Sequence, residues 1–71
     1  MKFIKLNEWY YDMHCHSNLT KPLMCNADEI SSFDVLDDSH DYMYGTTITM
    51  RNGTKHNVKE DFNYVFGKIE E

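Results

Sequence analysis

The residues best suited to chemistry are a run of metal-ligand types, His14, Cys15 and His16, with Asp12 just before it. If a β-strand continues through this run, the two histidines project from one face together with Asp12, while Cys15 projects from the other. A zinc site needs three or four converging ligands, so this pair is incomplete. Cys25, His40 or His56 could complete the site if folding brought one of them close, but no metal-ligand spacing in the sequence supports any of the three. We therefore interpret the histidines as solvent-facing and predict no metal and no cofactor.

Catalysis is not indicated by any group in the chain. Cys15 and Cys25 both lie in apolar alternation, where burial disfavours the thiolate that acts as a nucleophile. With three glycines, the sequence has no glycine-rich phosphate loop, and no serine stands in a nucleophile elbow. A chain of 71 residues also has little room for a site that excludes water. We predict that the protein is not an enzyme.

The aromatic residues are a second group, which could act by binding. The chain has one Trp, five Tyr and four Phe, and tryptophan and tyrosine are common anchors of protein interfaces. These rings either fill the core of a small domain or form an exposed contact surface. We expect Tyr10, on the polar face of its strand, to be exposed. The predicted partner-binding residues are Trp9, Tyr10, Tyr11, His14, His16, Asp37, Asp38, Asp41, Tyr42 and Tyr44.

The charge balance limits the class of partner. Twelve Asp and Glu against seven Lys and Arg give a formal net charge of −5. Direct binding of nucleic acid requires a basic face, which this composition does not provide. An acidic protein can instead dock on a basic partner, or imitate nucleic acid with an array of carboxylates. The residues available for such mimicry are Asp34, Asp37, Asp38, Asp41, Glu70 and Glu71.

The sequence predicts neither a membrane span nor secretion. Its longest apolar stretches are two or three residues, whereas a spanning helix needs about 20. The start of the chain lacks the apolar stretch of a signal peptide. The two cysteines are therefore expected to be free thiols in a reducing compartment. We expect a cytoplasmic protein that does not bind membranes.

The elements that position these residues begin with β-structure. Residues 3–6 alternate, and a clean period of two runs from Trp9 to Cys15. Residues 17–22 carry turn-forming side chains, and Pro22 stands at the only break. A short buried strand is expected after it, at residues 23–25.

A helical turn, a strand and an acidic loop are expected next. The side chains at 26–29 favour a turn because Asn and Asp bond to the nearby backbone. Phe33 and Val35 share one face of a strand at 31–36. Residues 37–41 form a solvated loop.

A β-hairpin around Asn-Gly is the strongest local signal, with its first strand at residues 46–50. A two-residue loop would mix apolar and polar residues on both faces. A three-residue loop at 51–53, with Gly53 left-handed, pairs Ile48 with His56 and gathers the apolar residues on one face. We predict the three-residue loop.

The last element expected from the sequence is an amphipathic helix. Phe62, Val65, Phe66 and Ile69 recur at helical spacing, and Asp61 is a suitable N-cap. This stripe should cover one face of the sheet. The sheet residues expected beneath it are Ile4, Leu6, Phe33, Val35, Ile48, Met50 and Val58.

These elements predict an α+β fold, a small antiparallel β-sheet or partly closed barrel of about five strands with a C-terminal amphipathic helix. The length suits a single small domain over residues 1–71. Within it, we interpret residues 8–21 as an inserted hairpin.

Three short motifs stand in order before the closing helix, at residues 25–30, 47–54 and 58–60. Together they resemble the FlbD-like small proteins, a flagellar family of Gram-positive and related bacteria; similar short reading frames are frequent in phages and mobile elements. The resemblance covers residues 1–7 and 22–69. It implies a small sheet or partly closed barrel with a terminal helix, and contact with other proteins. It implies no active site, and the family has only a short turn where residues 8–21 lie here.

The function predicted from these observations is that of a non-catalytic protein-binding or regulatory module. It would be an accessory or inhibitory factor of a phage or mobile element that acts on a larger bacterial protein through the inserted hairpin and the acidic loop. One alternative is an acidic nucleic-acid mimic that blocks a basic enzyme groove. Another is a small metal-stabilised domain using His14 and His16. Uncovered strand edges also predict a homodimer.

Overall fold

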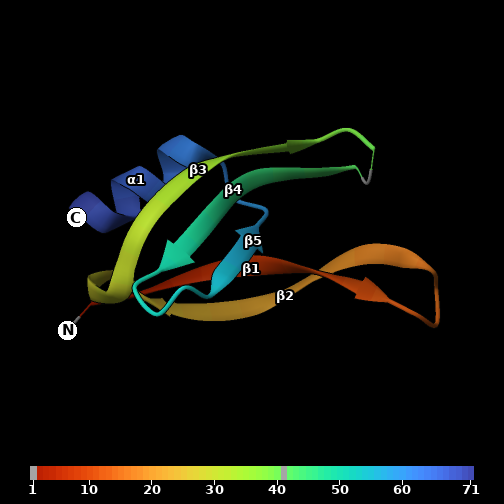
Figure 1. Ribbon diagram of the computed structural model, residues 1–71, viewed down its shortest axis with the longest axis horizontal. Coiled ribbons are helices and arrows are strands. Elements are labelled where there is room, and N and C mark those ends of the chain that lie inside the picture. The colour runs from red at the N-terminus through yellow and green to blue at the C-terminus, as the bar shows by residue number, and fades with distance from the viewer. Residues whose placement is uncertain (1, 41) are drawn as a thin grey trace.

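The computed structural model describes residues 2–40 and 42–71 (Figure 1). Over these residues the chain forms an α+β domain, as predicted, in which one C-terminal helix packs on a five-stranded antiparallel sheet. The sheet has the order β2-β1-β5-β4-β3 and does not close, so the barrel alternative is wrong. In chain order the elements are β1 (Phe3–Asp12), β2 (Ser17–Asn26), the 3₁₀ turn η1 (Ala27–Glu29), β3 (Ile30–Asp38), β4 (Met43–Met50), β5 (Lys55–Val58) and α1 (Phe62–Glu70).

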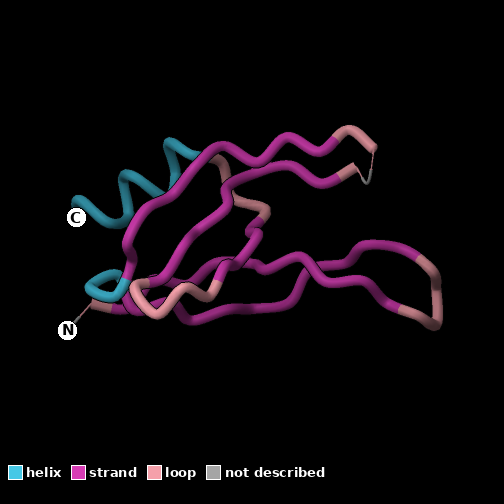
Figure 2. Tube along the Cα trace, viewed as in Figure 1, coloured by secondary structure: helices cyan, strands magenta, loops and turns pink. Residues whose placement is uncertain are grey.

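Two long hairpins, β1–β2 and β3–β4, share a base beside α1 and extend toward the same end of the molecule (Figure 1). Figure 2 shows the turns that close both hairpins at that end, with η1 and the β4–β5 loop at the opposite end. β5 is short and joins the hairpins. It pairs with β4 along its whole length but with β1 only between Val58 and Glu8. Residues 8–21, expected as an inserted hairpin, form the outer part of the β1–β2 hairpin.

The predicted strand from Trp9 to Cys15 is wrong beyond Asp12, where β1 ends. Asp12 Oδ1 accepts hydrogen bonds from the backbone N–H of His14 at 2.7 Å and of Cys15 at 3.3 Å. An aspartate that satisfies the N–H groups after it stabilises a turn in place of a strand ladder. The alternation in residue type therefore continues into a turn, where it no longer defines two faces.

Residues 17–22, predicted to form a turn, instead belong to β2. Pro22 lies opposite Asn7 in the β1–β2 ladder. Because β2 is an edge strand, a residue without an N–H group can be accommodated there when its donor position faces away from β1. The proline thus marks a sheet edge, and the short strand predicted after it is the inner part of β2.

The hairpin loop, the helical turn and the helix start were correctly predicted. Ile48 pairs with His56, and the N–H of Gly53, at φ 92°, donates to the Met50 carbonyl at 2.9 Å. η1 forms within residues 26–29, where Asn26 serves as its N-cap. Asp61 caps α1, with its Oδ1 accepting from the Tyr64 N–H at 2.7 Å.

The core lies between α1 and the base of the sheet. Its buried apolar members are Ile4, Leu6, Cys25, Ile48, Val58 and Val65, and those partly buried against it are Leu23, Ile30, Phe33, Met50 and Ile69. Two predicted members are wrong, because Val35 is 69% exposed and Phe66 is 49% exposed. Val35 lies farther along β3 than Phe33, outside the part that α1 covers. The ring of Phe66 is tilted by 46° to that of Phe33, with 6.4 Å between the ring centroids.

The helix that packs on this core is short. Within the described residues, no helix has the length and apolar character needed to cross a membrane.

Candidate functional site

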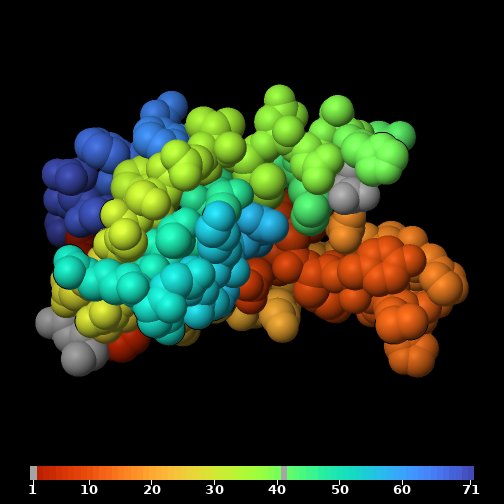
Figure 3. All heavy atoms as spheres, in the orientation of Figure 1, coloured from red at the N-terminus to blue at the C-terminus, as the bar shows by residue number. Residues whose placement is uncertain are grey.

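The two hairpins end at the side of the molecule away from α1 (Figure 1), and exposed apolar side chains lie at these hairpin ends. We define the hairpin-end surface as the exposed residues Tyr11, Met13, Tyr42 and Tyr44. Tyr42 is 85% exposed and Tyr11 is 57% exposed. In the space-filling view, parts of both hairpins reach this end (Figure 3). The fold therefore places two segments that are about thirty residues apart in the sequence at the same end of the molecule, each on its own hairpin.

Trp9 connects the two hairpins directly. Its Nε1–H group donates to the backbone oxygen of Tyr44 at 2.9 Å. The two rings also meet edge to face, with centroids 5.5 Å apart and an interplanar angle of 72°. β1 and β4 are not neighbours in the sheet, so this contact adds a link that the strand ladders do not provide. It fixes the β1–β2 hairpin relative to the first residues of β4.

The predicted exposure of Tyr10 is wrong, since Tyr10 is half-buried and Tyr11 is the exposed ring. The Lys21 ammonium lies 5.5 Å from the centroid of the Tyr10 ring, which is a cation–π arrangement. Tyr11 is on the opposite face of β1, and its hydroxyl lies 3.4 Å from His16 Nδ1. The sequence alternation placed the two rings on opposite faces correctly but predicted exposure for the wrong ring.

His14, Cys15 and His16 lie in the turn between β1 and β2, so the predicted shared strand face of the histidines with Asp12 does not exist. Residues 2–40 and 42–71 contain no group of three or more His, Cys, Asp or Glu side chains placed to hold a metal ion. Cys15 is exposed, contrary to its predicted core position. Cys25 is buried as predicted, and burial raises the pKa of its thiol.

The acidic residues do not form one array. Asp37 and Asp38, predicted to be in a loop, are the last residues of β3 at the hairpin end. Glu70 and Glu71 are at the C-terminal end of α1, near the opposite end of the molecule (Figure 1). Asp41 lies outside the described residues. The described residues therefore do not show the single array of carboxylates that the nucleic-acid mimic would require.

A polar junction between the hairpins was not predicted from the sequence. Glu60, in the segment between β5 and α1, accepts from the Asn7 backbone N–H at 2.9 Å and from Asn7 Nδ2 at 2.8 Å. Beside it, His56 Nδ1 lies 2.6 Å from Glu8 Oε2. These bonds hold β1 against the chain that leaves β5, so they fix the base from which both hairpins extend. No local spacing could have revealed them, because the partners are about fifty residues apart.

No protein-family model, curated protein or solved structure matches the chain. The FlbD-like resemblance therefore remains a prediction that depends on the sequence motifs.

Proposed function

We propose that this protein is a non-catalytic protein-binding module whose contact region is the hairpin-end surface. The observation that carries this proposal is the Trp9 to Tyr44 link, which holds two exposed aromatic hairpin ends in a fixed relation. A contact surface that is ordered before binding loses less conformational entropy in the complex. Exposed tyrosines suit such a surface because they bury a large area with few rotatable bonds.

The biological setting we propose follows the FlbD-like resemblance. The protein acts in the cytoplasm as an accessory or inhibitory factor of a phage or mobile element, and its target is a larger bacterial protein. The outer part of the β1–β2 hairpin, where the family has only a short turn, provides the contact particular to this chain. Loops and hairpin ends on a rigid scaffold are where binding commonly resides.

The test is affinity capture from a bacterial lysate with the wild-type chain and the double variant Tyr11→Ser, Tyr42→Ser. Both positions are exposed, so the variant should fold normally. Each anchor tyrosine in an interface contributes about 2 kcal/mol, so the variant should bind its target at least a hundredfold more weakly. The matched control is Tyr64→Ser, an exposed tyrosine on α1, which should bind as wild type does.

Salt dependence provides a second measurement on any captured complex. Aromatic anchoring should change little between low and high ionic strength, whereas binding dominated by carboxylates should weaken steeply. A target retained equally by the wild type and the double variant would place the contact elsewhere. A complex that dissociates in moderate salt would favour an acidic mimic.

We further propose that the protein forms a homodimer through a sheet edge or the β1–β2 hairpin. β2 and β3 are the edges of the sheet, and exposed edges pair readily with another copy. Light scattering at micromolar concentration should give about twice the chain mass. If β3 is the paired edge, Val35→Lys should yield a monomer, because this exposed residue lies in that strand. A monomeric wild-type chain would exclude the dimer at this concentration.

A further inference from the structure

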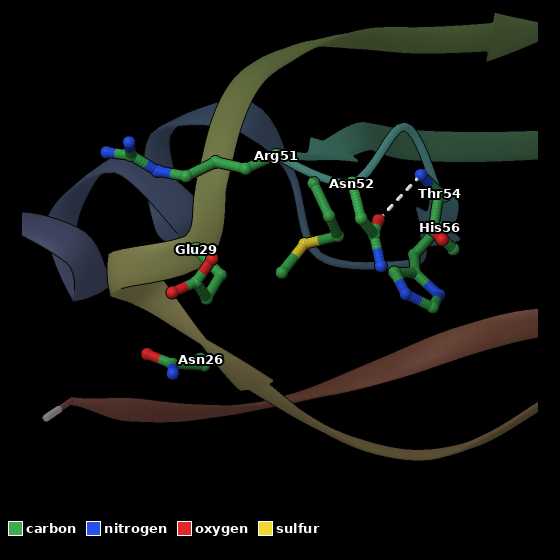
Figure 4. Close-up of a pocket in the computed structure, with 7 residues that line it drawn as sticks. Asn26, Glu29, Arg51, Asn52, Thr54 and His56 are labelled. Atoms are coloured by element: carbon green, nitrogen blue, oxygen red, sulfur yellow. Dashed lines mark hydrogen bonds between the residues drawn. The ribbon is translucent and has the colours of Figure 1, made fainter.

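A cavity of about 280 Å³ opens at the base of the molecule, between η1 and the β4–β5 loop (Figure 4). Asn26 and Glu29 lie on one side of it, and Asn52, Thr54 and His56 lie on the other. It is far from the hairpin-end surface and contains none of the predicted partner-binding residues. Its volume is near the lower limit for ligand sites, roughly 300 Å³. A ligand of amino-acid size fits, whereas a nucleotide cofactor does not.

Two hydrogen-bond acceptors face this cavity from its two sides. His56 Nδ1 is 2.6 Å from Glu8 Oε2, so the tautomer that donates to Glu8 has its proton on Nδ1 and its acceptor at Nε2. Across from it, the Glu29 carboxylate forms no hydrogen bond or ion pair with a residue in the described ranges. A primary ammonium group, with three N–H donors and a positive charge, matches the Glu29 carboxylate.

The two asparagines provide the complementary donors. Asn26 Oδ1 accepts from the Asp28 N–H at 3.0 Å, and Asn52 Oδ1 accepts from the Thr54 N–H at 2.9 Å. In each turn the amide oxygen of the asparagine is already bonded, which orients the side chain. The NH₂ group of each asparagine is the part that can donate to a ligand. Such donors match a carboxylate or a carbonyl oxygen. Arg51 lines the rim, and its side chain extends away from Asn52 and His56 (Figure 4).

We propose that this cavity binds a small zwitterion of the α-amino acid class. The ammonium group donates to Glu29 on one side of the cavity, and the carboxylate accepts from the Asn52 amide on the other side. A simple amine would leave the amide donors without partners, and a simple carboxylate would face the Glu29 charge. The Met50 thioether also lines the cavity and gives an apolar wall for the ligand side chain.

The experiment is a backbone-amide NMR titration of the full chain with each of the twenty amino acids at millimolar concentration. At least one should give saturable shifts confined to the cavity residues, with a Kd of about 1 mM, as expected for a small open site. The amine and the carboxylic acid derived from that amino acid, each lacking one charged group, should bind roughly tenfold more weakly.

Two nearly isosteric variants assign the charged ends. Glu29→Gln removes the carboxylate, and Asn52→Asp keeps the acceptor for the Thr54 N–H while removing the NH₂ donor. Each should weaken binding roughly tenfold, and Glu70→Gln, outside the cavity, should not. The proposal is overturned if no amino acid gives saturable shifts, if the simple amine binds as tightly as its amino acid, or if both cavity variants bind as wild type does.

Discussion

The Gly45→Ala variant is expected to lose a large part of the stability of the domain. Gly45 has φ +130°, which L side chains rarely adopt, and an added Cβ would overlap the carbonyl oxygen of Val58 and lie 2.7 Å from that of Lys59. Backbone strain of about 1 to 3 kcal/mol adds to overpacking of a similar size. The sum is a large part of the roughly 4 to 10 kcal/mol expected for a domain of 71 residues.

The chain that crosses Gly45 cannot easily move away. The Thr46 hydroxyl donates to the Glu60 carbonyl at 2.9 Å, and the Lys59 N–H donates to the Asn7 carbonyl at 2.8 Å. Both bonds hold the segment between β5 and α1 against the sheet. Relief of the overlap would therefore break the bonds that direct the chain from the sheet into the helix.

The other two glycines are the controls, measured by urea unfolding. Gly53, at φ 92°, has nothing within 4 Å of an added Cβ, so Gly53→Ala should cost only the local strain of about 1 to 2 kcal/mol. Gly67 lies inside α1 with open space around it, so Gly67→Ala should stabilise by about 0.5 to 1 kcal/mol. If Gly45→Ala unfolds at the same urea concentration as Gly53→Ala, the backbone at Val58 and Lys59 does not lie close to Gly45.

Features fixed by nearby residues were predictable from the sequence. The three-residue loop follows from which register gathers apolar residues on one face, and the helix start follows from an aspartate three residues before Tyr64. The fold class followed from these elements and their order. In each case the decisive partners lie within about ten residues of one another.

Features fixed by distant residues were not predictable. The requirement for glycine at position 45 arises from Val58 and Lys59, which a sequence pattern cannot place over it. Proline is expected to interrupt a strand unless the strand lies at the edge of a sheet. Whether Pro22 lies in an edge strand depends on the order of strands in the sheet, which the sequence does not show. The end of β1 has a local cause, because the turn-forming side chain of Asp12 ends the strand although the alternation of residue types continues.

In the candidate sites too, features fixed by nearby residues were predictable and those fixed by distant residues were not. Sequence alternation separated Tyr10 from Tyr11, but only the packing of Lys21 shows which ring is covered. The amino-acid cavity draws its residues from the end of β2, η1, the end of β4, the β4–β5 loop and β5, so no motif could have revealed it. Sequence reasoning found His56 as the partner of Ile48 and could not foresee its bond to Glu8.

Leu6→Ala should destabilise the domain by about 3 kcal/mol, the second-largest effect we expect. Leu6 is fully buried, pairs with Leu23 in the β1–β2 ladder and belongs to the core beneath α1. Truncation removes three buried carbon atoms and leaves a cavity that the surrounding strands can fill only partly. The measurement is the shift in the urea midpoint, at an unchanged slope, relative to wild type.

The matched comparison is Phe66→Ala, which removes more atoms from a residue that the helical pattern placed on the buried stripe. Because Phe66 is 49% exposed and its ring centroid is 6.4 Å from that of Phe33, its loss should cost only roughly 1 kcal/mol. The smaller side chain should therefore matter about three times more than the larger one. The reverse order would mean that α1 lies rotated on the sheet, with Phe66 in the core in place of Val65, as the sequence pattern alone allows.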